Sequence, residues 1–151
     1  MPPAAPGEQH GEMAFDVEQL LRLWTDLPVD DQAAEAAFRE VYADPVMING
    51  APVDAAALVT RARAIGAAFD RLEREVLDVV DDGGKAAVAF RLRGRHVGPL
   101  NTAAGPVPAT GRVMEIRVID VLTFTDGRIS SIWMVADELG ALAAADAVRL
   151  S

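Results

Sequence analysis

Apolar residues recur every three or four positions in the first half of the chain, and this spacing predicts helices. In the first such segment the apolar residues are Val17, Leu20, Leu21 and Trp24. An aspartate stands at the start of each segment, where its carboxylate can accept hydrogen bonds from free backbone N–H groups. The predicted helices are Phe15–Leu27, Asp30 or Asp31 to about Ala43, and Ala55 to about Phe69.

Alternation of apolar and polar residues takes over in the second half and predicts β-strands. Between the two halves, Pro45–Gly50 is a short apolar segment that ends in a turn. Helices come first and antiparallel strands follow, so the fold class is α+β, with one domain over residues 15–151. The predicted strands are Arg71–Val80, Lys85–His96, Arg112–Phe124 and Arg128–Ala136, and a last short helix starts at about Glu138.

Val97–Gly111 is a long connection with three glycines and three prolines. This composition predicts an irregular loop, because Gly and Pro interrupt helices and strands. Connections longer than about 12–15 residues are usually functional or disordered. We therefore expect this loop to lie at the mouth of a ligand pocket and to become ordered when a ligand binds.

The alternation also predicts which face of the sheet is buried. Even-numbered strand positions are mainly apolar, as in Val88 and Phe90, whereas charged residues such as Arg91, Arg93 and Arg95 gather at odd positions. The even face should therefore be the interior, and the arginine side chains should point outward.

The Asp126-Gly127 pair predicts a hairpin between the last two strands. We expect a three-residue loop that starts at Thr125, because this register pairs apolar residues with apolar residues across the two strands. Asp120 then lies opposite Ile132, and Met134 lies one diagonal away from Asp120, at roughly 7–8 Å.

Two polar residues, Asp120 and His96, interrupt the apolar even face. Burial of a lone carboxylate costs several kcal/mol, and an apolar cavity raises its pKa toward the range of a general acid or base. Asp120 is therefore a candidate catalytic group. The alternative is structural: Asp120 holds a loop or pairs with an arginine, and His96 hydrogen-bonds the backbone at the end of its strand.

The amino-acid composition excludes several classes of partner and metal site. The net charge is −9, from 14 basic and 23 acidic residues, which argues against a nucleic-acid or anionic-membrane partner. The chain has no cysteine, so disulfides and thiolate metal sites are excluded. The first 14 residues have neither the basic nor the apolar region of a signal peptide. We expect residues 1–14 to be a disordered arm and the protein to be cytoplasmic.

Three motifs resemble the SnoaL-like polyketide cyclase family: GRHVG at Gly94–Gly98, PATGR at Pro108–Arg112, and DGRISSIWMVADELGAL at Asp126–Leu142. The resemblance implies the nuclear-transport-factor-2-like fold, an α+β barrel in which N-terminal helices pack on a curved antiparallel sheet. Helices and sheet would enclose a conical, mostly apolar pocket. Members of the family are usually dimers or tetramers, so we expect a homodimer through the sheet, with Trp133 at the interface.

The resemblance also implies chemistry on small hydrophobic substrates, often aromatic or polyketide molecules. Such cyclases close a ring by intramolecular aldol condensation without metal or organic cofactor; related enzymes open epoxides or assist hydroxylation. This sequence departs from the family at one position, because Met134 stands where the family has its catalytic Asp. Asp120 stands where the cyclases have a catalytic His, so a carboxylate remains in the pocket at a different position.

Three further residues match family positions in part. Asn49 resembles a pocket Asn that holds water or a substrate oxygen, but it could equally be a turn residue before Gly50. Asp137 matches the end of a W-x-x-x-D motif, but its place before Glu138 favours a helix cap. Arg91 matches the Arg of an Asp-Arg-Asp set in the related epoxide hydrolases. That match would turn Arg91 inward, whereas the alternation turns it outward.

The predicted site has Asp120 and His96 as catalytic residues that share one cavity and no metal ligands. Three functions are compatible with it: a cofactor-independent enzyme of natural-product biosynthesis, a catalytically silent carrier or sensor of an apolar ligand, and an accessory protein that needs a partner enzyme. The residues expected to bind the substrate are Asn49, Met134, Trp24, Phe90, Val118, Leu122 and Ile132.

Overall fold

The computed structural model describes residues 15–151, and the predicted arm, residues 1–14, lies outside the described residues. The three predicted N-terminal helices are confirmed, with carboxylates of Asp16, Asp30 and Asp54 accepting hydrogen bonds from first-turn N–H groups. The short C-terminal helix is also present. The helices of the described residues are α2 (Val17–Thr25), α3 (Asp31–Val41), α4 (Ala55–Ala68) and α5 (Glu138–Ala144).

Six strands form one sheet in the order β2-β1-β8-β7-β4-β3, and β5 and β6 form a separate small hairpin. The predicted α+β class is confirmed, but the sheet is mixed, because β1 runs parallel to β8. The strands are β1 (Tyr42–Ile48), β2 (Ala51–Val53), β3 (Phe69–Asp81), β4 (Lys85–His96), β5 (Leu100–Thr102), β6 (Gly105–Val107), β7 (Val113–Thr125) and β8 (Arg128–Ala136).

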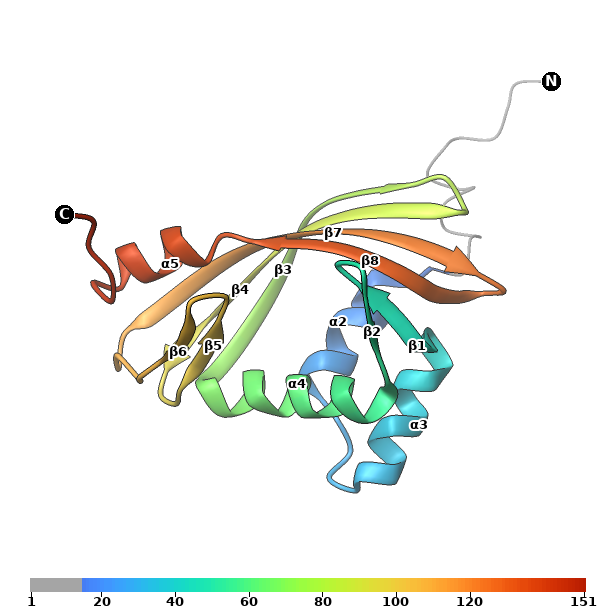
Figure 1. The fold of residues 1–151 in the computed structure, drawn as a ribbon, viewed down its shortest axis with the longest axis horizontal. Coiled ribbons are helices and arrows are strands. Elements are labelled where there is room, and N and C mark those ends of the chain that lie inside the picture. The colour runs from blue at the N-terminus through green and yellow to red at the C-terminus, as the bar shows by residue number, and fades with distance from the viewer. Residues whose placement is uncertain (1–14) are drawn as a thin grey trace.

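The helices α2, α3 and α4 lie on one side of the curved sheet, as Figure 1 shows. Helix α4 runs beneath the sheet, and α2 lies between α4 and the strands. Helix α5 projects beyond the end of the sheet that lies on the left in Figure 1, on the side away from α3. Strands β2 and β3 are the two edges, so the sheet does not close into a barrel. The core between helices and sheet contains the fully buried side chains of Phe38, Leu58, Met114, Leu122 and Ile129.

The inner and outer faces follow the predicted alternation. Even residues of β4 and β7, such as Val88 and Val118, are buried toward the helices. On the outer face, the Arg91 guanidinium pairs with the carboxylates of Glu75 and Glu115, with 2.9 Å between Arg91 Nε and Glu75 Oε2. Arg91 therefore points outward, as the alternation predicts.

The β7–β8 hairpin differs from its prediction. Its loop has two residues, Asp126 and Gly127, both with positive φ, and Thr125 pairs with Arg128. A register shift after this first part of the hairpin leaves Ser130 without a partner in the ladder. This bulge brings even residues back opposite even residues, so the inner face is as expected.

The bulge also changes which residues face Asp120. Asp120 pairs directly with Met134, not with Ile132, and Leu122 pairs with Ile132. The predicted diagonal offset between Asp120 and Met134 was therefore wrong. The carboxyl group and the residue at the family's usual catalytic position are direct cross-strand neighbours.

The segment Val97–Gly111 is partly regular, because it contains the β5–β6 hairpin. The prediction of an irregular loop missed these two strands, which have three residues each and contain Pro106. In Figure 1 the hairpin lies beneath the sheet, near the C-terminal end of α4. Among residues 15–151, no helix has the length and apolar character needed to cross a bilayer.

Candidate functional site

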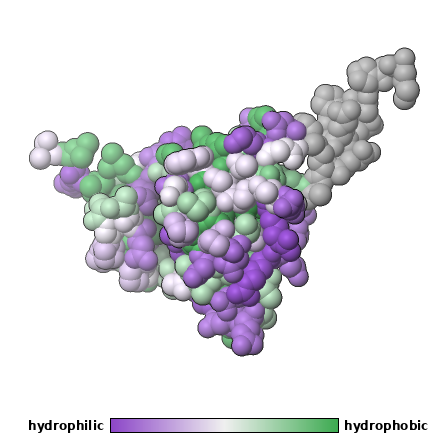
Figure 2. Space-filling model, turned by 45° about the vertical axis from the view of Figure 1, so that its right-hand side comes forward, coloured by the Kyte–Doolittle hydropathy of each residue, from purple (hydrophilic) through white to green (hydrophobic). Residues whose placement is uncertain are grey.

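A cavity of about 600 Å³ lies between the inner face of the sheet and helices α2 and α4. Its walls are mostly apolar, and they come from both halves of the chain. In the space-filling view, hydrophobic residues are visible near the centre of the face, and hydrophilic residues cover the lower part (Figure 2). This volume is in the usual range for a small-molecule site.

The cavity brings most of the predicted site residues together. Leu122, Asn49 and His96 are not among the residues that line it. Leu122 is fully buried in the core. The predicted residues that line the cavity are Trp24, Phe90, Val118, Asp120, Ile132 and Met134.

Asp120 is the carboxyl group on the sheet side of the cavity. Val88 and Met134 flank it on the neighbouring strands, and Val118 and Leu122 are its neighbours on the same face of β7. Its Oδ1 atom is buried and has no hydrogen-bond partner within residues 15–151. Burial raises the pKa of Asp120 to about 7. Both protonation states are therefore populated near neutral pH, as a group that accepts and returns protons requires.

His96 lies elsewhere. It is completely buried, and its Nδ1 accepts a hydrogen bond from the Thr110 backbone N–H at 3.2 Å. Its ring packs against Phe69, with 5.8 Å between ring centroids. Val88 is the residue opposite Asp120. His96 is eight residues further along β4, which is roughly 25 Å from Val88 measured along the strand. The structure therefore does not bring His96 and Asp120 into one cavity.

The Asn49 side chain holds the backbone of β8. Its Oδ1 accepts a hydrogen bond from the Met134 N–H at 2.8 Å, and its Nδ2 donates to the Met134 carbonyl at 3.3 Å. Asn49 has a φ of 50° and stands in the turn between β1 and β2. This geometry corresponds to the turn interpretation.

Asp137 is the N-cap of α5. Its carboxylate accepts a hydrogen bond from the Gly140 N–H at 2.9 Å and pairs with Arg117 at 2.9 Å. The hydrogen bond from Gly140, followed by that from Arg117, lowers the pKa of Asp137. The helix-cap interpretation is therefore confirmed.

Tyr42, the only tyrosine of the chain, was not among the predicted site residues. Tyr42 lines the same cavity as Asp120, and its hydroxyl oxygen accepts a hydrogen bond from Trp24 Nε1 at 2.8 Å. The predicted second helix ran one residue past Tyr42, which hid its place at the start of β1. The one available signal was a tyrosine among apolar residues, because a buried hydroxyl needs a polar partner.

The cavity lining also includes four polar or charged residues from α4, the β5–β6 hairpin and α5: Arg61, Asn101, Thr102 and Glu138. Glu138 Oε1 accepts a hydrogen bond from the Ala103 N–H at 3.1 Å, which ties the tip of the β5–β6 hairpin to the start of α5. Of the segment Val97–Gly111, residues 100–103 line the cavity, and its place at the mouth of the pocket stays a prediction. Whether a ligand orders this segment stays a prediction.

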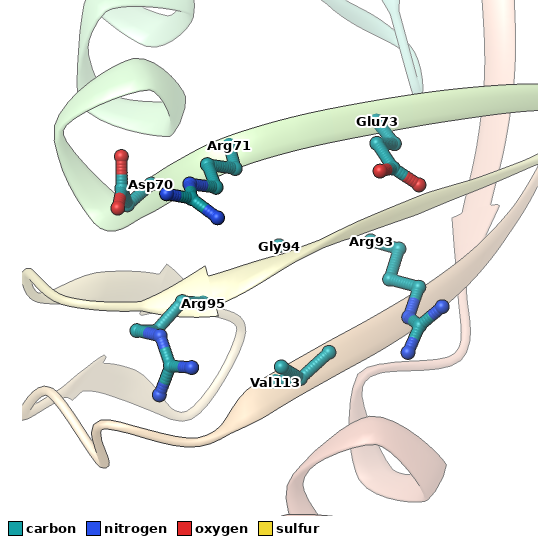
Figure 3. Close-up of a pocket in the computed structure, with 7 residues that line it drawn as sticks. All are labelled: Asp70, Arg71, Glu73, Arg93, Gly94, Arg95 and Val113. Carbon is teal, nitrogen blue, oxygen red and sulfur yellow. The ribbon is translucent and has the colours of Figure 1, made fainter.

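A second, shallower pocket of about 390 Å³ lies at β3, β4 and β7, away from the apolar cavity. Figure 3 shows Arg93 and Arg95 on β4, Val113 on β7, and Arg71 and Glu73 on β3. Asp70 also lines this pocket, and all five charged side chains are exposed. Charged groups in such a pocket are in contact with water, whereas the apolar cavity can shield a reacting group from it, so the cavity is the better candidate for chemistry. Among residues 15–151, no group of three or more His, Asp or Glu side chains could hold a metal ion.

Comparison with protein families gives one match. The model of the SnoaL-like polyketide cyclase family matches residues 18–145. This span runs from the first turn of α2 to the end of α5 and includes all eight strands. No curated protein sequence matches the chain.

Several solved structures share the fold at low sequence identity. TsrD from Streptomyces laurentii has a TM-score of 0.71 and 19% identity, over 98% of this chain and 100% of TsrD. A SnoaL-like polyketide cyclase from Agrobacterium tumefaciens has a TM-score of 0.65 and 19% identity, over 85% and 91% of the two chains. IdmH from Streptomyces antibioticus has a TM-score of 0.61 and 23% identity, over 84% and 95%. These chains have the same arrangement of helices and curved sheet.

Proposed function

The chain belongs to the SnoaL-like polyketide cyclase family, and from this premise we propose that it is a cofactor-independent enzyme that closes or modifies a ring in a small, apolar, polyketide-like molecule. Asp120 is the proposed general acid and base. One observation carries this proposal: a carboxyl group with a pKa of about 7 lines an apolar cavity, and its buried oxygen has no partner within residues 15–151.

In the proposed reaction, ionised Asp120 removes a proton from a carbon next to a substrate carbonyl, and the C–H electron pair becomes the enolate. The enolate carbon attacks a second carbonyl of the same molecule, which forms the C–C bond of the ring and an alkoxide. Protonated Asp120 then gives the proton to the alkoxide. This step returns Asp120 to its ionised carboxylate form, and the cycle needs no oxidant or reductant.

The same observation favours an enzyme over a silent carrier. An unpaired buried carboxyl lowers stability, because its charged form is poorly solvated. A carrier of apolar molecules would bind its ligand equally well if position 120 held an apolar residue. The cross-strand neighbour of Asp120 is such a residue, Met134. A proton-transfer role gives the carboxyl a use that offsets this cost.

The test is deuterium exchange at the acidic carbon of two apolar ketones, 2-tetralone and benzoylacetone, in D₂O by proton NMR. The wild-type protein should accelerate exchange, and Asp120→Asn should slow it by about 10²–10⁴-fold, because Asn cannot take a proton. Asp81→Asn is the matched control, since Asp81 is buried at the end of β3 and is not among the cavity residues. Equal rates for wild type and Asp120→Asn, or no acceleration by wild type, would overturn the proposal.

We further propose that the protein is a homodimer through the outer face of the sheet. Cross-strand pairs Ile119–Val135 and Val121–Trp133 form an apolar patch there. Val135 is 74% exposed and Trp133 59%, which is unusual for large apolar residues on a sheet. Sedimentation at micromolar concentration should give a dimer that Val135→Asp dissociates. The exposed loop substitution Val29→Asp should leave it intact, and a monomeric wild type would contradict the proposal.

A further inference from the structure

The hydroxyl group of Tyr42 has a free proton in the cavity wall. A tyrosine hydroxyl donates one hydrogen bond and accepts up to two. Here Trp24 Nε1 donates to the oxygen at 2.8 Å, so one acceptor position is occupied. Within residues 15–151, no group accepts a hydrogen bond from the hydroxyl in return. Buried polar hydrogens nearly always have an acceptor, so this one is available to a molecule in the cavity.

Aromatic packing fixes the position of this hydroxyl. The Tyr42 ring contacts Phe38 with 5.7 Å between centroids, and Trp24 packs edge-on against both rings. Tyr42 is 3% exposed and Phe38 is fully buried. Because rings and hydrogen bond restrain one another, the hydroxyl needs no rearrangement to meet a ligand. A donor fixed in advance is the arrangement that stabilises developing negative charge.

The hydroxyl stays protonated over the ordinary pH range. Burial raises the pKa of Tyr42 above its usual value, the hydrogen bond from Trp24 opposes this, and the negative charge of Asp120 raises it further. Tyr42 and Asp120 line the same cavity. Tyr42 is therefore a hydrogen-bond donor, and Asp120 is the group that exchanges a proton.

We propose that the Tyr42 hydroxyl, positioned by Trp24, is an oxyanion-binding group that donates a hydrogen bond to the carbonyl oxygen of a ligand whose adjacent carbon faces Asp120. The ligand class follows from the two groups: an apolar body that carries an enolisable ketone. When Asp120 removes the proton, the electron pair moves onto the oxygen, where Tyr42 stabilises it. This catalytic part rests on the proposed function, whereas ketone binding does not.

The experiment compares 2-tetralone with tetralin, the hydrocarbon of the same shape, by calorimetric titration. Wild type should bind the ketone more tightly than tetralin. Tyr42→Phe should lower the ratio of the two affinities about 2- to 10-fold, while tetralin binding stays unchanged. Trp24→Phe keeps the hydroxyl but releases it, so it should reduce the preference less. Tyr42→Phe should also slow exchange of 2-tetralone about 10²–10³-fold at saturation, the usual effect of losing one oxyanion donor.

Tyr42→Phe leaves the Trp24 N–H without its partner, so this variant could unfold. The double variant Trp24→Phe/Tyr42→Phe removes donor and acceptor together and keeps the aromatic packing, and it should show the same loss of ketone preference. An unchanged preference in whichever variant folds overturns the inference, even if Asp120-dependent exchange is seen. The opposite result, a Tyr42-dependent preference without exchange by wild type, overturns the proposed function and leaves the binding group in place.

Discussion

Two polar residues interrupt the apolar inner face of the sheet, and their surroundings differ. His96, at one end, is completely buried, and Thr110 holds one side of its ring through a backbone N–H and a hydroxyl. Asp120, toward the other end, lines a cavity, and its buried oxygen has no partner within residues 15–151. The same break in alternation therefore marks a structural contact in one case and the proposed reactive group in the other.

The difference between the two residues is the space beside them. His96 ends β4 next to the connection that returns to β7. Its Nε2, like Asp120 Oδ1, is buried without a partner within residues 15–151, but His96 is not among the residues that line the cavity. Asp120 lies between Val88 and Met134 on the neighbouring strands, and it lines the cavity between the sheet and helices α2 and α4. A polar residue on an apolar face becomes a candidate for chemistry only where a cavity gives a substrate access to it.

The largest expected effect concerns the pH dependence of exchange. The pKa of Asp120 is about 7, and only its ionised form removes a proton from carbon. The rate constant for 2-tetralone exchange should therefore fall about 10-fold per pH unit below 7 and level off above about 8. Proton NMR from pH 5 to 9 measures this profile. The His96→Leu variant should show the same profile, and a shifted midpoint would place His96 in the site.

The second effect is on stability, and its sign follows from the raised pKa. An unfolded Asp ionises near 3.9, whereas folded Asp120 ionises near 7. Between these values the folded state holds a proton that the unfolded state has lost, so stability falls as pH rises through this window. Asp120→Asn removes the titration and should be more stable than wild type by about 2–4 kcal/mol at pH 8, with little difference below pH 4. Urea unfolding at both pH values measures this, and a constant difference would contradict the raised pKa.

A smaller effect is expected at His96. The His96→Leu substitution keeps an apolar volume but leaves the Thr110 N–H without its acceptor, which should cost about 1–3 kcal/mol in free energy of unfolding. Exchange of 2-tetralone per folded molecule should be unchanged, because His96 does not line the cavity. Urea unfolding and NMR exchange on the same sample separate these outcomes. A large loss of exchange at unchanged stability would reverse the comparison.

Most of the fold could be predicted because its signals are local. Capping aspartates and helical spacing placed α2, α3 and α4, and alternation placed β4 and β8 with their observed bounds. Strand β1 was missed because it is short, contains Pro45 and pairs in parallel with β8, far along the chain. The bulge at Ser130 was missed because two- and three-residue hairpin loops suit the same Asp-Gly pair.

The site was predicted only in part, because a cavity is a property of several elements together. Asp120 could be found because it breaks the alternation of a single strand. Tyr42 gave only a weak signal, a tyrosine among apolar residues, since its proposed role depends on Trp24 in α2 and on Asp120 in β7. His96 was assigned to the cavity because facing inward was equated with facing the pocket. Facing inward is necessary for a site residue, and His96 shows that it is insufficient.

The smallest effect is expected at Asp137, a carboxylate that differs from Asp120 in having its partners in place. Hydrogen bonds from Gly140 and Arg117 lower its pKa, so its contribution to stability is present above the ordinary Asp range and is lost as pH falls through the lowered value. Asp137→Ala should lower the melting temperature by about 2–6 °C at pH 7 through loss of the cap. Asp137→Asn keeps a capping oxygen and should recover most of this loss. Binding of 2-tetralone should be unchanged in both variants. If Asp137→Ala kept its melting temperature and lost ketone exchange, Asp137 would belong to the site. The presence of hydrogen-bond partners would then no longer distinguish a structural carboxylate from a reactive one.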